Sequence, residues 1–478
     1  MLFPNFCAIV SLLVHSSVPT THNQPDDCQA TVTSARDSHH WANWRGPSVD
    51  GRAADSANPP VTWSTTSNIA WKTPIPGRGI NTPVVWEEKM FLLTAIPLTG
   101  EATGNEQAGS GEARGEQLGR GEFRVGGGER GGRRGGGGAP AGMQALVVFC
   151  LNRHDGSIVW QKEVHRAVPH EGLHETNTYA SASAVTDGQR LFASFGSFGI
   201  YCLSLDGDVL WSRDLGNMRT RNAFGEGGSP ALHGDTLVVP WDHEGPSQLF
   251  ALDASTGETR WQVDRDEPTT WATPLITEFN GQLQVVTNGT NRVRSYDLAD
   301  GTLIWEAAGQ VANPIPTPLR IDDMVICMTG YRGFAIQAIK LTAKGDATRS
   351  SSMVWSRNDS APYVSSAVLD DGKLFFTKSR DAIISVVDAR KGEVLVAQTR
   401  LPGLDTIYAS PLAAGGRVYF AGRNGNTTVV EHRDGELHVL ATNELGETID
   451  ASPIAIGDQL YIRGEHHVFC IAEKNRAP

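Results

Sequence analysis

Short polar segments between apolar runs hold the residues that could do chemistry. Residues 170–174 read HEGLH, which matches the HExxH pattern that binds zinc in metalloproteases. That pattern needs a helix to place both histidines on one face, yet Pro169 precedes it and Gly172 interrupts it. The sequence therefore predicts a polar loop here, without protease activity.

Other signatures of metal or nucleophilic chemistry are weaker. Asp242, His243 and Glu244 are metal-binding residue types in one turn, but no partner stands at a metal-ligand spacing. The nucleophile elbow, the P-loop and the dinucleotide fingerprint are absent from the sequence. The six cysteines form no CxxC, which removes the signal for a zinc ribbon, a thioredoxin-type site or an attached haem. We therefore expect no catalytic residue and no metal site.

The polar segments instead predict a binding face, because loops on a rigid scaffold are where recognition residues gather. The candidates are His174, Glu175, Asn177, Tyr179, Arg221, Asn222, Glu226, Trp241, Asp242, His243, Glu244, Trp271, Arg332, Tyr363 and Arg423. We expect the turn that carries Trp241 to Glu244 to be exposed, and to lie beside Arg221, Asn222 and Glu226.

A repeat covers nearly the whole chain and must position these segments. A pair of small residues opens an apolar strand eight times, and the intervals after the first are 42 to 49 residues long. The pairs are Thr82-Pro83, Ser183-Ala184, Ser229-Pro230, Thr273-Pro274, Thr317-Pro318, Ser366-Ala367, Ser410-Pro411 and Ser452-Pro453. A glycine followed four residues later by a large apolar residue recurs in step, as in Gly257 and Trp261.

Each repeat reads as four strands, which is the pattern of a propeller blade. Eight units predict an all-β, eight-bladed β-propeller with four-stranded blades over residues 61–475. The last unit has only three strands before the chain ends, and residues 68–75 form a spare strand that carries Trp71. We therefore expect this N-terminal strand to close the ring.

The remaining segments have distinct compositions. Residues 6–14 are apolar and are followed by small residues, so residues 1–20 are predicted to be a signal peptide, with an N-terminal extension over 21–60. Residues 98–143 are rich in Gly, Arg and Glu, which predicts a disordered insertion within the propeller. The net charge of −12 argues against nucleic-acid binding, and no apolar run is long enough for a transmembrane helix.

The unit AxDxxxGxxxW at residues 251–261 resembles the tryptophan-docking repeat of pyrroloquinoline quinone (PQQ) propellers. The resemblance implies that a set of tryptophans docks neighbouring blades. These are Trp71, Trp160, Trp211, Trp261, Trp305 and Trp355. The opening WRGP at residues 44–47 is also similar to secreted PQQ-like repeat proteins of planctomycete-type bacteria.

Two branches of this family imply different functions. Quinoprotein dehydrogenases hold PQQ and calcium and typically carry a ring of two adjacent cysteines, which this sequence lacks. The BamB-type scaffold lipoprotein of the outer-membrane assembly machinery is not catalytic. We expect a secreted or periplasmic, monomeric propeller that binds an unidentified protein or small-molecule ligand through its loop-rich face. The alternative is a PQQ- and calcium-dependent quinoprotein oxidoreductase.

Overall fold

The computed structural model describes residues 40–98 and 136–473, which lie in one compact unit. Strands form almost all of its regular structure, and the two short 3₁₀ helices span Gly196–Phe198 (η1) and Arg221–Ala223 (η2). The predicted signal peptide and most of the predicted insertion lie outside the described residues, as do residues 21–39 of the predicted extension.

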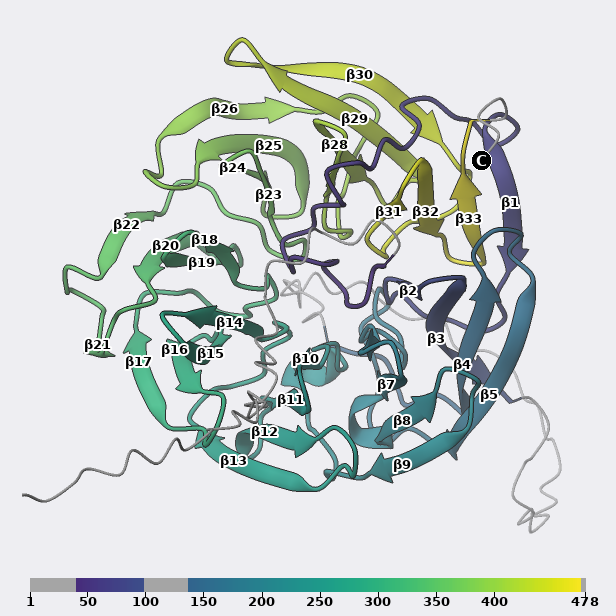
Figure 1. Ribbon diagram of the computed structural model, residues 1–478, viewed down its shortest axis with the longest axis horizontal. Helices are drawn as coiled ribbons and strands as arrows, with labels where there is room; N and C mark the ends of the chain where they lie inside the picture. Colours follow the sequence, from purple (N-terminus) through teal and green to yellow (C-terminus); the bar gives the residue numbers. More distant parts are fainter. Residues whose placement is uncertain (1–39, 99–135, 474–478) are drawn as a thin grey trace, which may run out of the picture. The chain divides into compact units, whose positions relative to one another are not determined.

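The strands form eight sheets arranged in a ring, which confirms the predicted eight-bladed propeller (Figure 1). The first four blades consist of β2 (Val84–Trp86), β3 (Lys89–Pro97), β4 (Gln144–Asn152) and β5 (Ile158–Ala167); β6 (Val185–Thr186), β7 (Arg190–Ser194), β8 (Ile200–Ser204) and β9 (Val209–Arg213); β10 (Ala231–His233), β11 (Thr236–Trp241), β12 (Ser247–Asp253) and β13 (Thr259–Arg265); β14 (Leu275–Phe279), β15 (Gln282–Thr287), β16 (Val293–Asp297) and β17 (Leu303–Ala307).

The other four blades repeat this antiparallel order. They consist of β18 (Leu319–Ile321), β19 (Met324–Thr329), β20 (Ala335–Lys340) and β22 (Met353–Arg357); β23 (Val368–Asp370), β24 (Lys373–Lys378), β25 (Asp381–Asp388) and β26 (Val394–Arg400); β27 (Leu412–Ala414), β28 (Arg417–Ala421), β29 (Asn426–Arg433) and β30 (Glu436–Glu444); β31 (Ile454–Ile456), β32 (Gln459–Arg463), β33 (His467–Ile471) and β1 (Ile69–Pro74). The short β21 (Gly345–Asp346) adds a fifth, parallel strand to blade 4.

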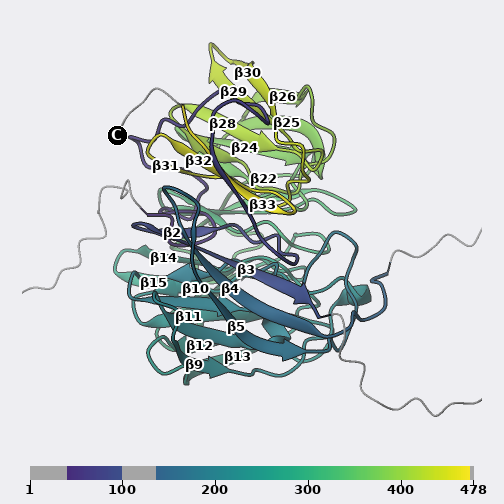
Figure 2. The ribbon, with the colours of Figure 1, turned by 90° about the vertical axis from the view of Figure 1, so that its right-hand side faces the viewer.

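The ring closes through the N-terminal strand, as the sequence predicted. β1 pairs antiparallel with β33, and Trp71 stands opposite Cys470 (the junction faces the viewer in Figure 2). The same register recurs around the ring. In all eight blades the buried third-strand residue at this position faces a Trp or a Val on the fourth strand.

Outer tryptophans join five of the blades to the next blade. The indole N–H of Trp71 donates to the carbonyl of Arg153 at 3.0 Å, and Trp160, Trp211, Trp261 and Trp355 make the equivalent bond one blade further on. A glycine of the neighbouring turn lies against each of these rings. A Cβ at that position would collide with the indole, so a larger residue does not fit there.

Trp305 departs from this pattern. Its indole donates to Gln284 Oε1 within its own blade, at 3.2 Å. The turn after β20 is longer than in the other blades, and it lays β21 along β17 where the next blade's tight turn would otherwise receive the indole. Blade 4 is therefore joined to blade 5 in a different way from the docking expected for Trp305.

The described N-terminal segment, residues 40–67, packs against the propeller. Trp41 forms a β-bridge with Val85 of blade 1, and Arg52 forms one with Ala413 of blade 7. Arg45 is buried, and its guanidinium donates to the carbonyls of Ala367 at 2.6 Å and of Pro411 at 3.3 Å. This segment, drawn in purple, crosses several blades in Figure 1. Burial lowers the pKa of Arg45 to about 10.

Candidate functional site

A cleft opens among the irregular segments of blades 2 to 4. Its walls come from the links β5–β6, β9–β10 and β13–β14 and from the turns β7–β8 and β11–β12. In an antiparallel four-stranded blade these segments all emerge on one face of the ring, which we call the link face. The cleft holds about 770 Å³, counting the space open to solvent.

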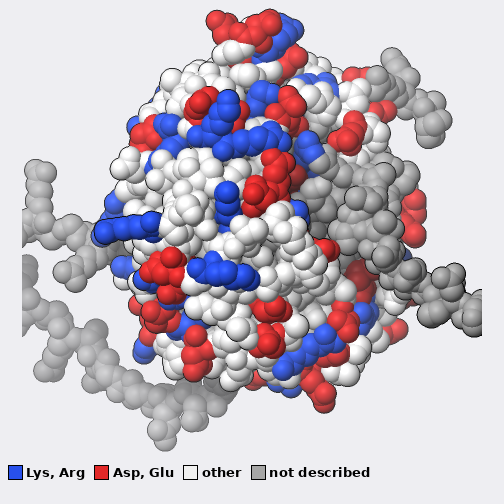
Figure 3. Space-filling view, turned by 60° about the vertical axis from the view of Figure 1, so that its left-hand side comes forward, with Lys and Arg blue, Asp and Glu red and all other residues white. Residues whose placement is uncertain are grey.

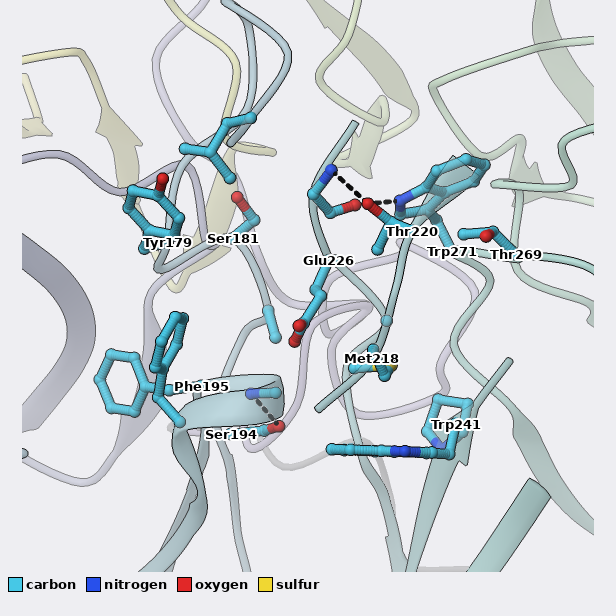
Figure 4. Close-up of a pocket in the computed structure, with 18 of the residues that line it drawn as sticks. Tyr179, Ser181, Ser194, Phe195, Met218, Thr220, Glu226, Trp241, Thr269 and Trp271 are labelled. Atoms are coloured by element: carbon cyan, nitrogen blue, oxygen red, sulfur yellow. Dashed lines mark hydrogen bonds between the residues drawn. The ribbon is translucent and has the colours of Figure 1, made fainter. Parts of the chain in front are cut away.

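Aromatic side chains form two sides of this cleft, which we call the aromatic cleft. Tyr179 and Phe195 stand on one side, and Trp241 and Trp271 stand on the other (Figure 4). Phe198 also lines the cleft and packs edge-on against Tyr179. The indole of Trp271 donates to the carbonyl of Gly225 at 2.7 Å, and the hydroxyl of Tyr179 donates to the carbonyl of Glu171 at 3.2 Å. These bonds fix both rings, so the cleft is formed before any ligand enters.

The polar lining of the aromatic cleft is acidic. Glu171 and Glu226 line it without an ion-pair partner, a third carboxylate, Asp242, is paired with Arg265, and none of the described residues that line the cleft is Lys or Arg. Six hydroxyl side chains complete the lining, namely Thr178, Ser181, Ser194, Thr220, Thr269 and Thr270. Acidic and aromatic groups together favour a ligand that carries a positive charge on an apolar body.

Glu226 lies between the two aromatic sides (Figure 4). Its carboxylate accepts hydrogen bonds from the backbone N–H of Ser197 at 2.8 Å and from the Ser197 hydroxyl at 2.5 Å. Burial raises the pKa of Glu226 to about 7, and the charge of Glu171 adds to this, while the Ser197 bonds oppose it. The charge of the cleft therefore changes near neutral pH.

Glu171 is held differently. Its carboxylate accepts hydrogen bonds from the backbone N–H of Thr220 at 3.0 Å and from the Thr220 hydroxyl. This residue belongs to the HEGLH segment, which forms no helix. The ring of His170 bonds to the carbonyl of Met218 at 2.7 Å, and the described residues hold no group of three His, Cys, Asp or Glu suited to a metal ion.

The expectation of an exposed turn at residues 241–244 is wrong for its first three residues, which are only 4 to 7% exposed. The Asp242 carboxylate forms a buried ion pair with Arg265, with oxygen–nitrogen distances of 2.7 and 3.0 Å. One ring nitrogen of His243 accepts from the backbone N–H of Arg219, and the other bonds to the carbonyl of Pro246. Only Glu244 is exposed, so most of this turn holds the blade together.

The other predicted residues separate into groups. Asn177 donates to the carbonyls of Phe224 and Glu226, His174 packs edge-on against Phe224, and both thereby support the rim of the aromatic cleft. The guanidinium of Arg221 donates to the side-chain oxygen of Asn313, and the backbone carbonyl of Asn222 accepts from the backbone N–H of Gly137.

Four predicted residues lie away from the aromatic cleft. Tyr363 stacks on Tyr331 at 4.9 Å, and Arg332 lies over the Tyr331 ring. Glu175 and Arg423 line a second cleft, described below. Elsewhere positive and negative side chains are interspersed, as in the view of Figure 3.

Sequence reasoning missed Phe195, Ser197, Phe198 and Met218. The first three belong to the segment FGSFG at residues 195–199, in the turn between β7 and β8. Two phenylalanines among glycines at a turn are the signal that could have identified them, because a polar turn needs no aromatic residue.

The comparisons with known proteins agree with this fold. The profile of the family described as outer membrane protein assembly factor BamB matches residues 144–398, and the chain belongs to this family of PQQ-like propellers. No curated protein matches the sequence at a significant level. No helix of the described residues is long and apolar enough to cross a membrane.

Solved structures of the same fold include members with different roles. BamB from Moraxella catarrhalis is 16% identical and has a TM-score of 0.50, with 72% of this chain and 94% of that chain covered. Quinohemoprotein alcohol dehydrogenase from Comamonas testosteroni is 10% identical with a TM-score of 0.57, covering 93% and 82%. A europium-containing methanol dehydrogenase is 10% identical with a TM-score of 0.55, covering 91% of each chain. At these identities the likeness concerns the fold alone.

Two features that the resemblance associates with PQQ and its calcium ion are not found among the described residues. The sequence contains no adjacent cysteines, and the four described cysteines are buried in strands. Burial raises the pKa of Cys150, Cys202 and Cys470 to about 12, so these thiols are neutral packing groups. Carboxylates from the described residues also gather in no set of three that would hold the calcium.

Proposed function

We propose that this propeller is a secreted or periplasmic binding module that holds a lysine- or arginine-bearing segment of a partner protein in the aromatic cleft. The observation that carries the proposal is the lining, which has five aromatic side chains and two carboxylates, Glu171 and Glu226, that form no ion pair with the described residues, and no Lys or Arg among its described residues. An ammonium or guanidinium group gains both from a carboxylate and from the face of an aromatic ring. Membership of the BamB family favours a scaffold role.

Calorimetric titration with a capped peptide that alternates lysine and leucine tests this function. At pH 8 the double variant Glu171→Gln, Glu226→Gln should bind at least tenfold more weakly than the parent protein, a change of about 1.4 kcal/mol. Glu393→Gln is the control, because it removes one carboxylate from an exposed turn of blade 6. Equal binding by the double variant and the parent would exclude the aromatic cleft as the site.

A quinoprotein dehydrogenase is the second candidate function, because two dehydrogenases are among the solved structures that share this fold. Adding PQQ and Ca²⁺ to the pure protein should leave its melting temperature unchanged if the binding proposal is right. A tight ligand stabilises a protein by RT ln(1 + [L]/Kd), so a clear rise would restore the dehydrogenase hypothesis.

A further inference from the structure

A second cleft lies at the junction of the last blade with the first. It is lined by the link β1–β2, by the turns β28–β29 and β32–β33, and by the links β5–β6 and β30–β31. Six of its lining residues are charged, namely Arg78, Arg423 and Arg463 and, with opposite sign, Glu175, Asp450 and Glu465. We call it the arginine cleft; it holds about 630 Å³, counting the space open to solvent.

Arg463 is a buried cation without a counter-charge. It is 3% exposed, and none of the described carboxylates pairs with it. Its Nη1 donates to Asn81 Oδ1 at 2.6 Å and to the carbonyl of Leu93 at 2.9 Å, which ties blade 8 to blade 1. Burial lowers the pKa of Arg463 to about 9. Buried charges in proteins are normally paired, so an anion in the cleft would supply the counter-charge that Arg463 lacks.

The other edge of this guanidinium is free. Nε and Nη2 of Arg463 have no hydrogen-bond partner among the described residues, although the side chain lines the cleft. Gly79 lies against Nη2, since a Cβ on Gly79 would come within 2.5 Å of that atom. A guanidinium edge with two N–H groups matches the two oxygens of a carboxylate.

Arg423 is the second cation of the cleft, and 29% of its side chain is exposed. Its guanidinium pairs with Asp450 at 2.7 Å and lies over the Tyr408 ring at 4.7 Å from the centroid. Burial raises the pKa of Asp450, and the charge of Glu465 adds to the effect, while Arg423 and Arg78 oppose it. The less exposed part of the cleft thus has two guanidinium groups, Arg463 and Arg423, and one carboxylate, Asp450, an excess of one positive charge.

The mouth has the opposite excess. Glu175, Glu465 and Arg78 are exposed, which places two carboxylates and one guanidinium at the entrance. Arg78 donates to the backbone carbonyl of Glu175 at 3.5 Å. Positive charge inside and negative charge at the mouth match a ligand whose anionic end enters first and whose cationic end stays near solvent.

We propose that the arginine cleft binds a small zwitterion, a free α-amino acid, with its carboxylate at the free edge of Arg463 and its ammonium between Glu175 and Glu465. The proposal concerns a cleft and a ligand different from those of the proposed function, so either can fail while the other stands.

Calorimetric titration of the full chain with L-alanine tests the proposal, with propionate as the analogue that lacks the ammonium group. We expect saturable binding below roughly 50 mM, since so small a ligand has few contacts, and at least fivefold weaker binding of propionate. No saturation with L-alanine, or equal affinities for the two compounds, would overturn the proposal.

Variants at the mouth locate the site without endangering the fold. The double variant Glu175→Gln, Glu465→Gln should lower the affinity for L-alanine at least fivefold without lowering the affinity for propionate, because the loss of two carboxylates cannot weaken the binding of an anion. Glu393→Gln should change neither affinity. Arg463→Met should abolish binding of both compounds. Arg463 also joins two blades, so if the Arg463→Met variant does not fold, the double variant at the mouth tests the site in its place. An unchanged affinity for L-alanine in the double variant would refute the assignment.

Discussion

The backbone N–H of Ser452 donates a hydrogen bond to the hydroxyl of Thr82 at 3.2 Å, and this bond joins the last blade to the first. The same bond links almost every pair of neighbouring blades. In each case the backbone N–H of the strand-opening residue donates to the hydroxyl of the strand-opening residue in the next blade. The other donor and acceptor pairs are Thr82 and Ser183, Ser183 and Ser229, Ser229 and Thr273, Thr317 and Ser366, Ser366 and Ser410, and Ser410 and Ser452.

At the remaining junction the direction differs, because the hydroxyl of Thr317 donates to the carbonyl of Thr273 at 2.6 Å. A hydrogen-bonded circuit of eight Ser and Thr residues thus runs around the inner ends of the blades. All eight residues are buried, so water cannot replace a lost partner. The small-residue repeat of the sequence therefore has a physical role besides opening the strands.

Removing one hydroxyl from this circuit should destabilise the whole ring. Ser452→Ala leaves the backbone N–H of Ser410 without its acceptor, and an unsatisfied buried donor costs about 1–3 kcal/mol. Ser452→Thr should stay near the parent protein, because Thr occupies the same position in three other blades. Urea denaturation measures both; equal stability of the Ala variant and the parent would show that the circuit contributes nothing.

Deleting residues 1–75 should prevent soluble folding. The deletion removes β1 and Trp71, which is 9% exposed and bonds to Arg153. Loss of one buried Trp costs about 3–5 kcal/mol, a large part of the 5–15 kcal/mol that stabilises a typical domain. A chain that starts at residue 40 keeps every contact described here and should fold. Circular dichroism and gel filtration of both proteins show whether each is folded and monodisperse. A folded chain starting at residue 76 would refute ring closure by β1.

The sequence was sufficient to predict the fold because the signals that specify a propeller are local and repeated. A Ser or Thr opening marks the start of every blade, and a Gly-x-x-x-Trp turn marks the outer strand of most of them. The spare strand with Trp71 indicates how the ring closes. The site was harder to predict, since it forms where irregular links meet. His243 is buried where the backbone N–H of Arg219 bonds to its ring. Asp242 is buried where it pairs with Arg265, which lies 23 residues later in the sequence. No local pattern indicates either contact.

The buried pair of Asp242 and Arg265 should be essential for stability. The carboxylate and guanidinium are 3% and 1% exposed, so Asp242→Ala leaves an unpaired buried cation. Breaking such a pair costs about 3–5 kcal/mol. Asp322→Ala is the matched control, because its pair with Arg390 is about half exposed, and exposed pairs contribute about 0–1 kcal/mol. Similar melting temperatures for the two variants would contradict the structural role assigned to residues 241–243.

Glu226 should make stability fall as the pH rises from about 4.5 to about 7. Its folded-state pKa is about 7 against an ordinary value of 4.5, so the native state holds more protons than the unfolded state in this window. Each unit of pKa difference corresponds to at most about 1.4 kcal/mol, and partial exposure of the side chain reduces this. Glu226→Gln should flatten the stability profile between pH 5 and pH 8. A profile as steep as that of the parent would contradict the raised pKa.

Hydrogen–deuterium exchange with and without the lysine–leucine peptide tests the central claim most directly, because it locates the bound ligand on the ring. Binding in the aromatic cleft predicts slower exchange in residues 170–181, 195–199 and 218–227, which line or support it. The turn that contains Glu393 should exchange at the same rate in both samples. Protection confined to the outer strands or to the face opposite the link face, with the aromatic cleft unchanged, would contradict the assignment.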